Sequence, residues 1–385
     1  MGDPNEVDYP SYENMTDDEY EDVVRSYLWP NQLESLFVGI FCVVFLVGVI
    51  GNTLVVMVVI SKRTMWSSMN IVLANLACAD LLVLLFCLPP TVINDVTKTF
   101  WFSNVACKSI IFFQNTSVYV SIQSLVFISF ERWRAITYPL KRPIRATRKV
   151  IAGTWVLSIV LSLPEPITLN LQPANFTKEN FTTTWGTRCM ETWSADFERR
   201  YQVFMFLVFY LMPLLLISYL CFHMRNTLRS SELKIGKLQL AHRRKAIRML
   251  IAVVAVFAFS YLPVHWYHLK SAFEKGREEE EVEEEEIDMN WIALSKLTPR
   301  FFSYSSSCLN PILYNFMCGR FRKEFARVVF CRPVKGRDNT LRYTTQRLHR
   351  QNNGLFNGRA LCSSIGHGTL VKSTLSSSMD SLTKA

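Results

Sequence analysis

Apolar residues in this chain fall into long blocks that carry almost no ionisable side chains. Five clear blocks cover residues 35–61, 109–130, 201–222, 249–269 and 301–319. Two weaker blocks cover 65–94, interrupted by Asp80, and 150–164, followed by Glu165 and more apolar residues. About 20 helical residues cross the ~30 Å hydrocarbon core of a bilayer. The pattern predicts an all-α membrane protein with seven transmembrane spans, because a buried soluble helix could mimic one block but not all.

Lys and Arg residues follow spans 1, 3, 5 and 7, so they gather on one side of the predicted bundle. They lie within residues 62–63, 141–149, 225–245 and 320–327. Loops rich in Lys and Arg stay in the cytoplasm, which places the N-terminus outside the cell. The formal net charge of +10 belongs to these loops and to the tail, so it does not indicate nucleic-acid binding.

The chain divides into an acidic extracellular N-terminus over 1–34, a membrane bundle over 35–330 and a disordered cytoplasmic tail over 331–385. A second acidic run, 278–286, lies between spans 6 and 7. Such runs are either solvated, self-repelling loops or a field that concentrates a cationic ligand, and both descriptions can hold. No cleavable signal peptide is visible, so span 1 is expected to act as the insertion signal.

Sequons and cysteines agree with this topology. Asn14, Asn175 and Asn180 begin glycosylation sequons on the predicted outside, whereas the sequon at Asn115 lies inside span 3, where the transferase cannot reach it.

Among the ten cysteines, only Cys107 and Cys189 fall on the oxidising outer side, where they can pair and tie the loop before span 5 over the bundle. Cys331, just past span 7, is a candidate palmitoylation site.

One carboxylate lies in the middle of a span, where an ionisable group is costly and suggests a function. Asp80 in span 2 has three candidate partners: Asn52 in span 1, Ser121 in span 3 and Asn310 in span 7. Carboxylate, hydroxyl and amide oxygens could hold Na⁺ or a proton there. The alternative is that Asp80 only hydrogen-bonds neighbouring helices. Apart from this Na⁺ ion, no cofactor or metal is expected.

The inner end of span 3 carries the sequence Glu131-Arg132-Trp133. Arg132 could extend to the lipid headgroups, or it could pair with Glu131 as a latch that opens when a neighbouring helix moves. The residues alone leave both open.

Prolines interrupt five of the predicted spans and remove backbone hydrogen bonds there. In lipid, neighbouring groups can satisfy the freed carbonyls, and the resulting kinks can be passive bends or hinges. These prolines are Pro89, Pro90, Pro164, Pro166, Pro213, Pro263 and Pro311.

Taken in order, these residues resemble the rhodopsin-like (class A) G-protein-coupled receptors over roughly residues 35–330. Any one motif is weak, but the ordered set is specific. The matching positions are Gly51-Asn52, Leu76–Asp80, Cys107 with Cys189, Glu131-Arg132-Trp133 in place of Asp-Arg-Tyr, Trp155, Pro213, Phe257–Pro263 and Asn310–Tyr314.

Within that family the chain is most similar to the orexin receptors and the related invertebrate allatotropin receptors. The features that carry this likeness are Trp133, Tyr261 where most members have Trp, Gln114, Tyr304, Asp95, the segment Cys189–Trp193 and the segment Asp18–Pro30. Three features depart from the pattern. Cys221 replaces the usual Tyr of span 5, Arg300 replaces a His of orexin receptors, and the 278–286 run has no counterpart. These departures favour an allatotropin-like over a vertebrate orexin-type specificity.

The resemblance implies a plasma-membrane neuropeptide receptor whose second extracellular loop forms a hairpin. It implies that the peptide contacts Asp95, Gln114, Glu191, Trp193, His265, His268, Arg300 and Tyr304. For the two histidines, simple helix packing is the alternative. A basic, amidated peptide would suit the acidic mouth, with Glu191 and Asp95 best placed to pair with its Arg.

The same resemblance implies an activation switch in which span 6 swings outward about Pro263 and a heterotrimeric G protein, through the Gq class and calcium, enters the opened cleft. The switch residues are Glu131, Arg132, Trp133, Phe257, Tyr261, Pro263, Asn310, Pro311 and Tyr314. A short amphipathic helix after Gly319 is expected to lie on the membrane, and the Ser/Thr-rich tail to be phosphorylated by receptor kinases and read by arrestin.

Other classes fit less well. An amine receptor needs a carboxylate where Gln114 stands, and an opsin needs a Lys where Tyr304 stands. A transporter or channel would show repeats or a charged pathway, and an enzyme would need a nucleophile–base or metal cluster; the sequence shows neither. Receptors for neuropeptide FF, neuropeptide Y or cholecystokinin-like peptides remain the nearest alternatives.

Overall fold

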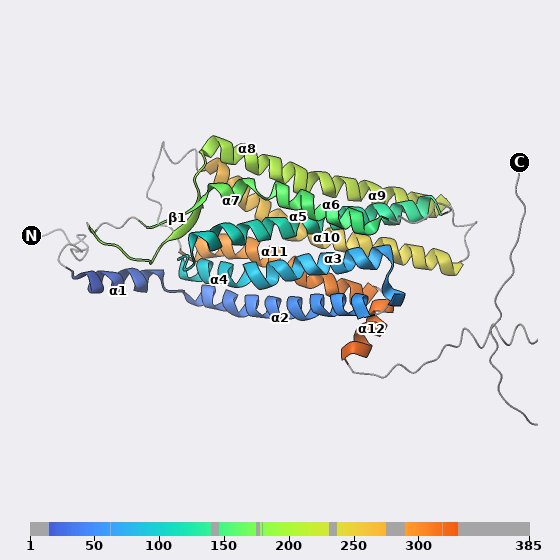
Figure 1. Ribbon diagram of the computed structural model, residues 1–385, viewed down its shortest axis with the longest axis horizontal. Coiled ribbons are helices and arrows are strands. Elements are labelled where there is room, and N and C mark those ends of the chain that lie inside the picture. Colours follow the sequence, from blue (N-terminus) through green and yellow to red (C-terminus); the bar gives the residue numbers. More distant parts are fainter. Residues whose placement is uncertain are drawn as a thin grey trace, which may run out of the picture. The chain divides into compact units, whose positions relative to one another are not determined.

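Seven helical rods form a bundle in the computed structural model (Figure 1), which describes residues 15–61, 63–139, 146–174, 178, 180–230, 237–274, 289–317 and 319–329. Within these residues, the rods in chain order are α2 (Gln32–Ser61), α3 (Ser68–Leu82) continued by η3 (Val83–Cys87) and α4 (Leu88–Thr97), α5 (Asn104–Thr137), α6 (Thr147–Leu161) with α7 (Pro164–Thr168), α8 (Ala195–Met205) continued by η4 (Phe206–Leu211) and α9 (Met212–Ser230), α10 (Lys237–Glu274) and α11 (Met289–Met317). The predicted seven-helix fold is confirmed.

Length and apolarity let six of these rods cross a membrane, counted over the described residues. The remaining rod, α11, is 29 residues long but carries Lys296 and Arg300 in its first half. Most rods extend beyond the apolar blocks because polar turns are tolerated outside the hydrocarbon. Ser103, for example, caps α5 by accepting from the amide of Ala106.

Wide π-helical turns precede the prolines of spans 2 and 5. Segment η3 ends just before Pro89 and Pro90, and η4 ends just before Pro213. A proline cannot donate to the carbonyl four residues earlier and clashes with it. Those carbonyls lie within η3 and η4, where the i→i+5 pattern relieves the clash. In contrast, Pro263 and Pro311 lie inside continuous helices.

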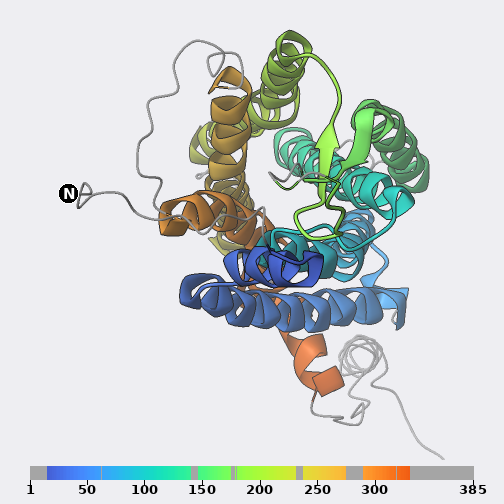
Figure 2. The same ribbon diagram turned by 90° about the vertical axis from the view of Figure 1, so that its left-hand side faces the viewer.

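A two-stranded hairpin crosses the predicted outer end of the bundle (Figure 2). Strand β1 (Leu169–Gln172) pairs antiparallel with β2 (Arg188–Glu191), and Leu171 lies opposite Cys189. A disulfide joins Cys189 to Cys107 in the first turn of α5. The hairpin form of this loop and the Cys107–Cys189 pairing, both expected from the sequence, are confirmed.

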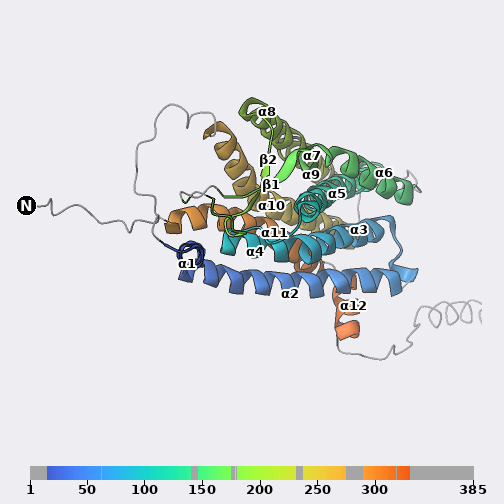
Figure 3. The ribbon, with the colours of Figure 1, turned by 60° about the vertical axis from the view of Figure 1, so that its left-hand side comes forward.

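The N-terminal segment contains a helix that the sequence analysis did not anticipate. Helix α1 (Asp17–Leu28) is capped by Thr16 and lies next to the outer end of α2 (Figure 3). Its contacts with the hairpin loop include an ion pair of Lys178 Nζ with Asp17 at 2.5 Å, an edge-to-face contact of the Tyr20 and Phe181 rings, and a hydrogen bond that Thr183 donates to Glu21 at 2.6 Å.

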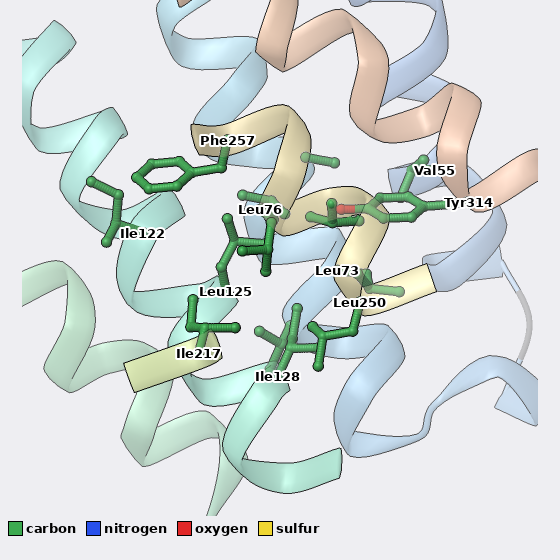
Figure 4. Packing of buried hydrophobic residues seen from close by; sticks show 14 of the residues in the cluster. Val55, Leu73, Leu76, Ile122, Leu125, Ile128, Ile217, Leu250, Phe257 and Tyr314 are labelled. Atoms are coloured by element: carbon green, nitrogen blue, oxygen red, sulfur yellow. The ribbon is translucent and has the colours of Figure 1, made fainter. Parts of the chain in front are cut away.

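Apolar packing fills the inner half of the bundle. Side chains from six rods meet around Leu76 and Leu125, with Ile217 and Phe257 on opposite sides (Figure 4). Helix α12 (Gly319–Val329) follows α11 and buries Phe321 against Tyr314. Its remaining faces carry Arg and Lys, as the predicted surface helix requires.

Candidate functional site

A polar cavity lies in the outer half of the bundle, between α5, α7, α8, α10 and α11. Its polar lining consists of Gln114, Asn115, Tyr119, Glu165, Tyr201, Gln202, Tyr261, His265, His268 and Ser303. Apolar side chains, including Val118, Phe209 and Val264, complete the lining. An enclosed site with a few convergent polar groups is the usual form of a ligand pocket.

Gln114 lines this cavity and contacts Tyr304, which lies behind it and is not part of the lining. The hydroxyl of Tyr304 lies 3.3 Å from Gln114 Oε1 and 3.2 Å from Thr91 Oγ1. Tyr304 is buried, at 3% exposure. These bonds link α11 to α5 and α4, so a ligand that contacts Gln114 acts on three helices.

Asp95 and Arg300, both predicted to contact a ligand, pair with each other. Arg300 Nε on α11 contacts Asp95 Oδ2 on α4, and the Asp95 side chain is only 7% exposed. Neither lines the polar cavity described above. The expectation that Asp95 would receive the Arg of a peptide therefore competes with an internal ion pair.

The two loop residues of the predicted site lie at the end of the hairpin. Glu191 is the last residue of β2. The Trp193 ring packs on Tyr201 with centroids 4.8 Å apart, and on Phe197 at 5.4 Å. Through Tyr201, Trp193 contacts the cavity wall rather than its interior.

His265 and His268 both line the polar cavity. His265 also packs its ring against Tyr210, at 5.1 Å between centroids, and against Phe206 at 5.7 Å. Packing and ligand access are thus not exclusive alternatives for His265.

Asp80 lies in a second, smaller cavity below the first. Asn310 Nδ2 donates to Asp80 at 2.9 Å, and Ser121 lines the same cavity. Asn52 donates to the Ser307 carbonyl, while its own Oδ1 is buried with no hydrogen-bond partner within the described residues. Carboxylate, hydroxyl and amide oxygens are suitable donors for Na⁺, so these residues fit the ion that the sequence suggested.

At the predicted inner end, Arg132 lies beside a third cavity lined by Met69, Met249, Leu250 and Tyr314 among others. Arg132 Nη2 contacts Met69 Sδ. Glu131 Oε2 is buried and has no hydrogen-bond partner within the described residues.

Trp133 makes a contact that the sequence analysis missed. Its indole Nε1 donates to His223 Nδ1 on α9 at 3.1 Å. This bond joins α5 to α9 two residues beyond Cys221, the position at which rhodopsin-like receptors usually carry a Tyr.

The expected switch residues of α10 and α11 lie between these cavities. The rings of Phe257 and Tyr261 pack in a tilted arrangement with centroids 5.0 Å apart. Tyr210, in the π turn η4 that precedes α9, extends this aromatic row by packing on Phe257. Pro263 and Pro311 lie within their helices near this row.

Six polar residues of the cavity lining were not predicted from the sequence: Asn115, Tyr119, Glu165, Tyr201, Gln202 and Ser303. Glu165 carried a usable signal, because it is an ionisable residue within an otherwise apolar span. For Tyr201 and Gln202 the apolar block gave no indication of which helix face points inward.

Of the predicted modification sites, only Asn180 falls among the described residues, in the loop between β1 and β2. It has a positive φ of 59°, a conformation that Asn adopts more readily than most residues. Asn14, Asn175, Cys331 and the acidic run 278–286 lie outside the described residues.

Comparison with known proteins finds a family match within the membrane bundle that the sequence predicts. Residues 51–314 match the family described as 7 transmembrane receptor (rhodopsin family). The chain is also 30% identical to cholecystokinin receptor type A of Cavia porcellus over 364 aligned residues, which cover 77% of this chain and 81% of the relative. The matched segment contains all three cavities.

Proposed function

Because the chain belongs to the rhodopsin family of seven-transmembrane receptors, we propose that it is a plasma-membrane receptor for an extracellular neuropeptide. Membership makes it a multi-pass membrane protein that couples ligand binding to a G protein, and not an enzyme. The finer assignment concerns the class of ligand.

The observation that carries a peptide ligand is the neutral Gln114 in the cavity wall, which Tyr304 and Thr91 behind it hold through hydroxyl contacts. A small amine would need a carboxylate there to pair with its ammonium group. Amide and hydroxyl groups instead suit the carbonyl and N–H groups of a peptide. The hairpin above the cavity adds the surface that a longer ligand needs.

Among peptides, an allatotropin-like or orexin-like ligand is favoured. Support comes from two residues in which this chain resembles those receptors, Tyr261 and Trp193, because both lie at the polar cavity. Tyr261 lines the cavity and Trp193 covers Tyr201 in its wall. A cholecystokinin-like peptide is the second candidate, because a receptor named for that peptide is a relative at 30% identity.

Signalling would proceed by a shift between two states of the bundle that the ligand binds unequally. Movement of α10 about Pro263 would disturb the Phe257–Tyr261 row below the ligand. It would also widen the inner cavity beside Arg132, where α10 contributes Met249 and Leu250. A G protein of the Gq class would occupy the widened cleft.

Calcium mobilisation in cells that express the full chain tests the assignment. The panel contains synthetic amidated peptides of the allatotropin, orexin and cholecystokinin types. A potent response to the first type supports the proposal, a response only to the third moves the assignment to the second candidate, and a response to none refutes both.

Variants test the site itself. Tyr304→Phe removes the hydroxyl but keeps the ring, and should reduce peptide potency roughly 5- to 10-fold, the effect of about 1 kcal/mol for one hydrogen bond. Tyr219→Phe, on the exposed side of α9, is the matched control and should leave potency unchanged. Equal potency of both variants would remove Tyr304 from the site.

A further inference from the structure

Glu165 is a carboxylate held inside the polar cavity by its local backbone. Helix α6 ends at Leu161, and the chain restarts at Pro164 as the short helix α7. This break turns Glu165 toward α5, where Asn115 Nδ2 donates to its Oε2 at 2.6 Å. Both residues line the cavity.

Within the described residues, no positively charged side chain pairs with Glu165. The lining of the cavity contains no Lys or Arg, and in the part of the chain that the structure describes no Lys or Arg forms an ion pair with Glu165. Glu191 on β2 and Glu198 on α8 lie within electrostatic range and make this side of the cavity more negative. Asp95, by contrast, already pairs with Arg300.

We propose that Glu165, oriented by Asn115, is the residue that receives the cationic group of the ligand, a guanidinium or an ammonium. The inference rests on the proposed function, and it assigns the cation contact to Glu165 instead of Glu191 or Asp95, the two carboxylates favoured from the sequence. An ionised group in a site of low polarity is costly unless a partner compensates it. An entering cation supplies that compensation, and Asn115 fixes the direction in which the carboxylate points.

A purely structural role makes a different prediction. If Glu165 only joined α7 to α5 through Asn115, its loss would weaken every ligand equally. If it binds a cation, its loss would affect only ligands that carry the charge.

The first experiment uses the most potent peptide of the calcium panel and its analogue in which Arg is replaced by citrulline, a neutral isostere. With the native chain, citrulline should lower potency about 10- to 100-fold, as for a charge-assisted hydrogen bond. With Glu165→Gln, the two peptides should be equally potent. If the ratio between the peptides is the same in both receptors, the assignment of Glu165 is overturned.

The second experiment does not depend on the peptide. The purified full chain is heated with Nα-acetyl-arginine amide or Nα-acetyl-citrulline amide at millimolar concentration, since a compound that binds only the folded state raises the melting temperature. Arginine amide should raise it more, and Glu165→Gln should abolish the difference. Equal melting temperatures with the native chain would overturn the proposal.

The two experiments separate the two hypotheses. If no panel peptide acts but arginine amide stabilises through Glu165, the peptide assignment fails and the cation site stands. If peptides activate the receptor but Glu165→Gln leaves the potency ratio of the Arg and citrulline peptides unchanged, the peptide assignment stands and the cation site fails. Surface expression is measured for each variant. Asp196→Asn, on the exposed side of α8, serves as the control. Glu165→Asp keeps the carboxylate and should retain the preference for the cationic ligand.

Discussion

Gly48 on α2 should be intolerant of even a methyl group. A Cβ built there would lie 2.6 Å from Leu84 Cδ1 and 3.3 Å from Cys308 Cβ. Leu84 is fully buried, at 0% exposure, so its side chain has little room to retreat. Overpacking of this kind costs ~1–3 kcal/mol. Gly48→Ala should therefore destabilise the bundle despite the higher helix propensity of Ala.

Gly39, on the same helix, is the matched control because a Cβ there has nothing within 4 Å. Both substitutions gain the same helix propensity of about 1 kcal/mol, so their difference isolates the clash. Melting temperatures of the two purified variants should differ by several degrees, with Gly48→Ala the lower. Equal melting temperatures would show that Leu84 can move and that the packing argument is wrong.

Three further outcomes are expected. Asp80→Asn should abolish any effect of replacing NaCl by N-methylglucamine chloride on peptide affinity, and a persisting effect would place the ion elsewhere. Arg132→Ala should eliminate G-protein activation but preserve peptide binding; normal activation would refute its role in the inner cavity. Hydrogen bonds from Thr16 lower the pKa of Glu19 below its usual 4.5. The contribution of ionised Glu19 to the stability of α1 is thus fully present above its usual pKa of 4.5 and is lost as pH falls through the lower folded-state pKa. Protection of the first-turn amides, relative to the unfolded exchange rate at the same pH, should fall there in the native chain, with no such pH step in Glu19→Gln.

The spans could be predicted from the sequence because lipid imposes a strict requirement on the backbone. Every N–H and C=O in hydrocarbon needs an internal partner, so a long uncharged block must be helical. Helix α1 lies outside that constraint. It is short and mostly polar, and its stability comes from Tyr20 and Val24, which are buried by contacts distant in the sequence.

The site was only partly predictable, for a related reason. A mid-span carboxylate such as Asp80 stands out against an apolar background, and the structure brings it to Asn310. The partner of Arg300 could not be inferred, since Asp95 lies 205 positions earlier and nothing local joins them. In the sequence Glu165 only interrupts a run of apolar residues, whereas in the structure the break at Pro164 directs it inward.

The wide turn η3 has a consequence for transferring positions between relatives. A π turn accommodates one residue more than an α turn, and each residue advances a helix by about 100°. Beyond Cys87, side chains therefore face a different direction from the one expected if a regular α-helix continued outward from Asp80. Thr91 and Asp95 point toward α11 on that account. When this rod is aligned with a relative that has a regular turn, corresponding residues of the outer half are best counted from Pro89 and those of the inner half from Asp80. The side chains compared in this way lie on the same face of the helix.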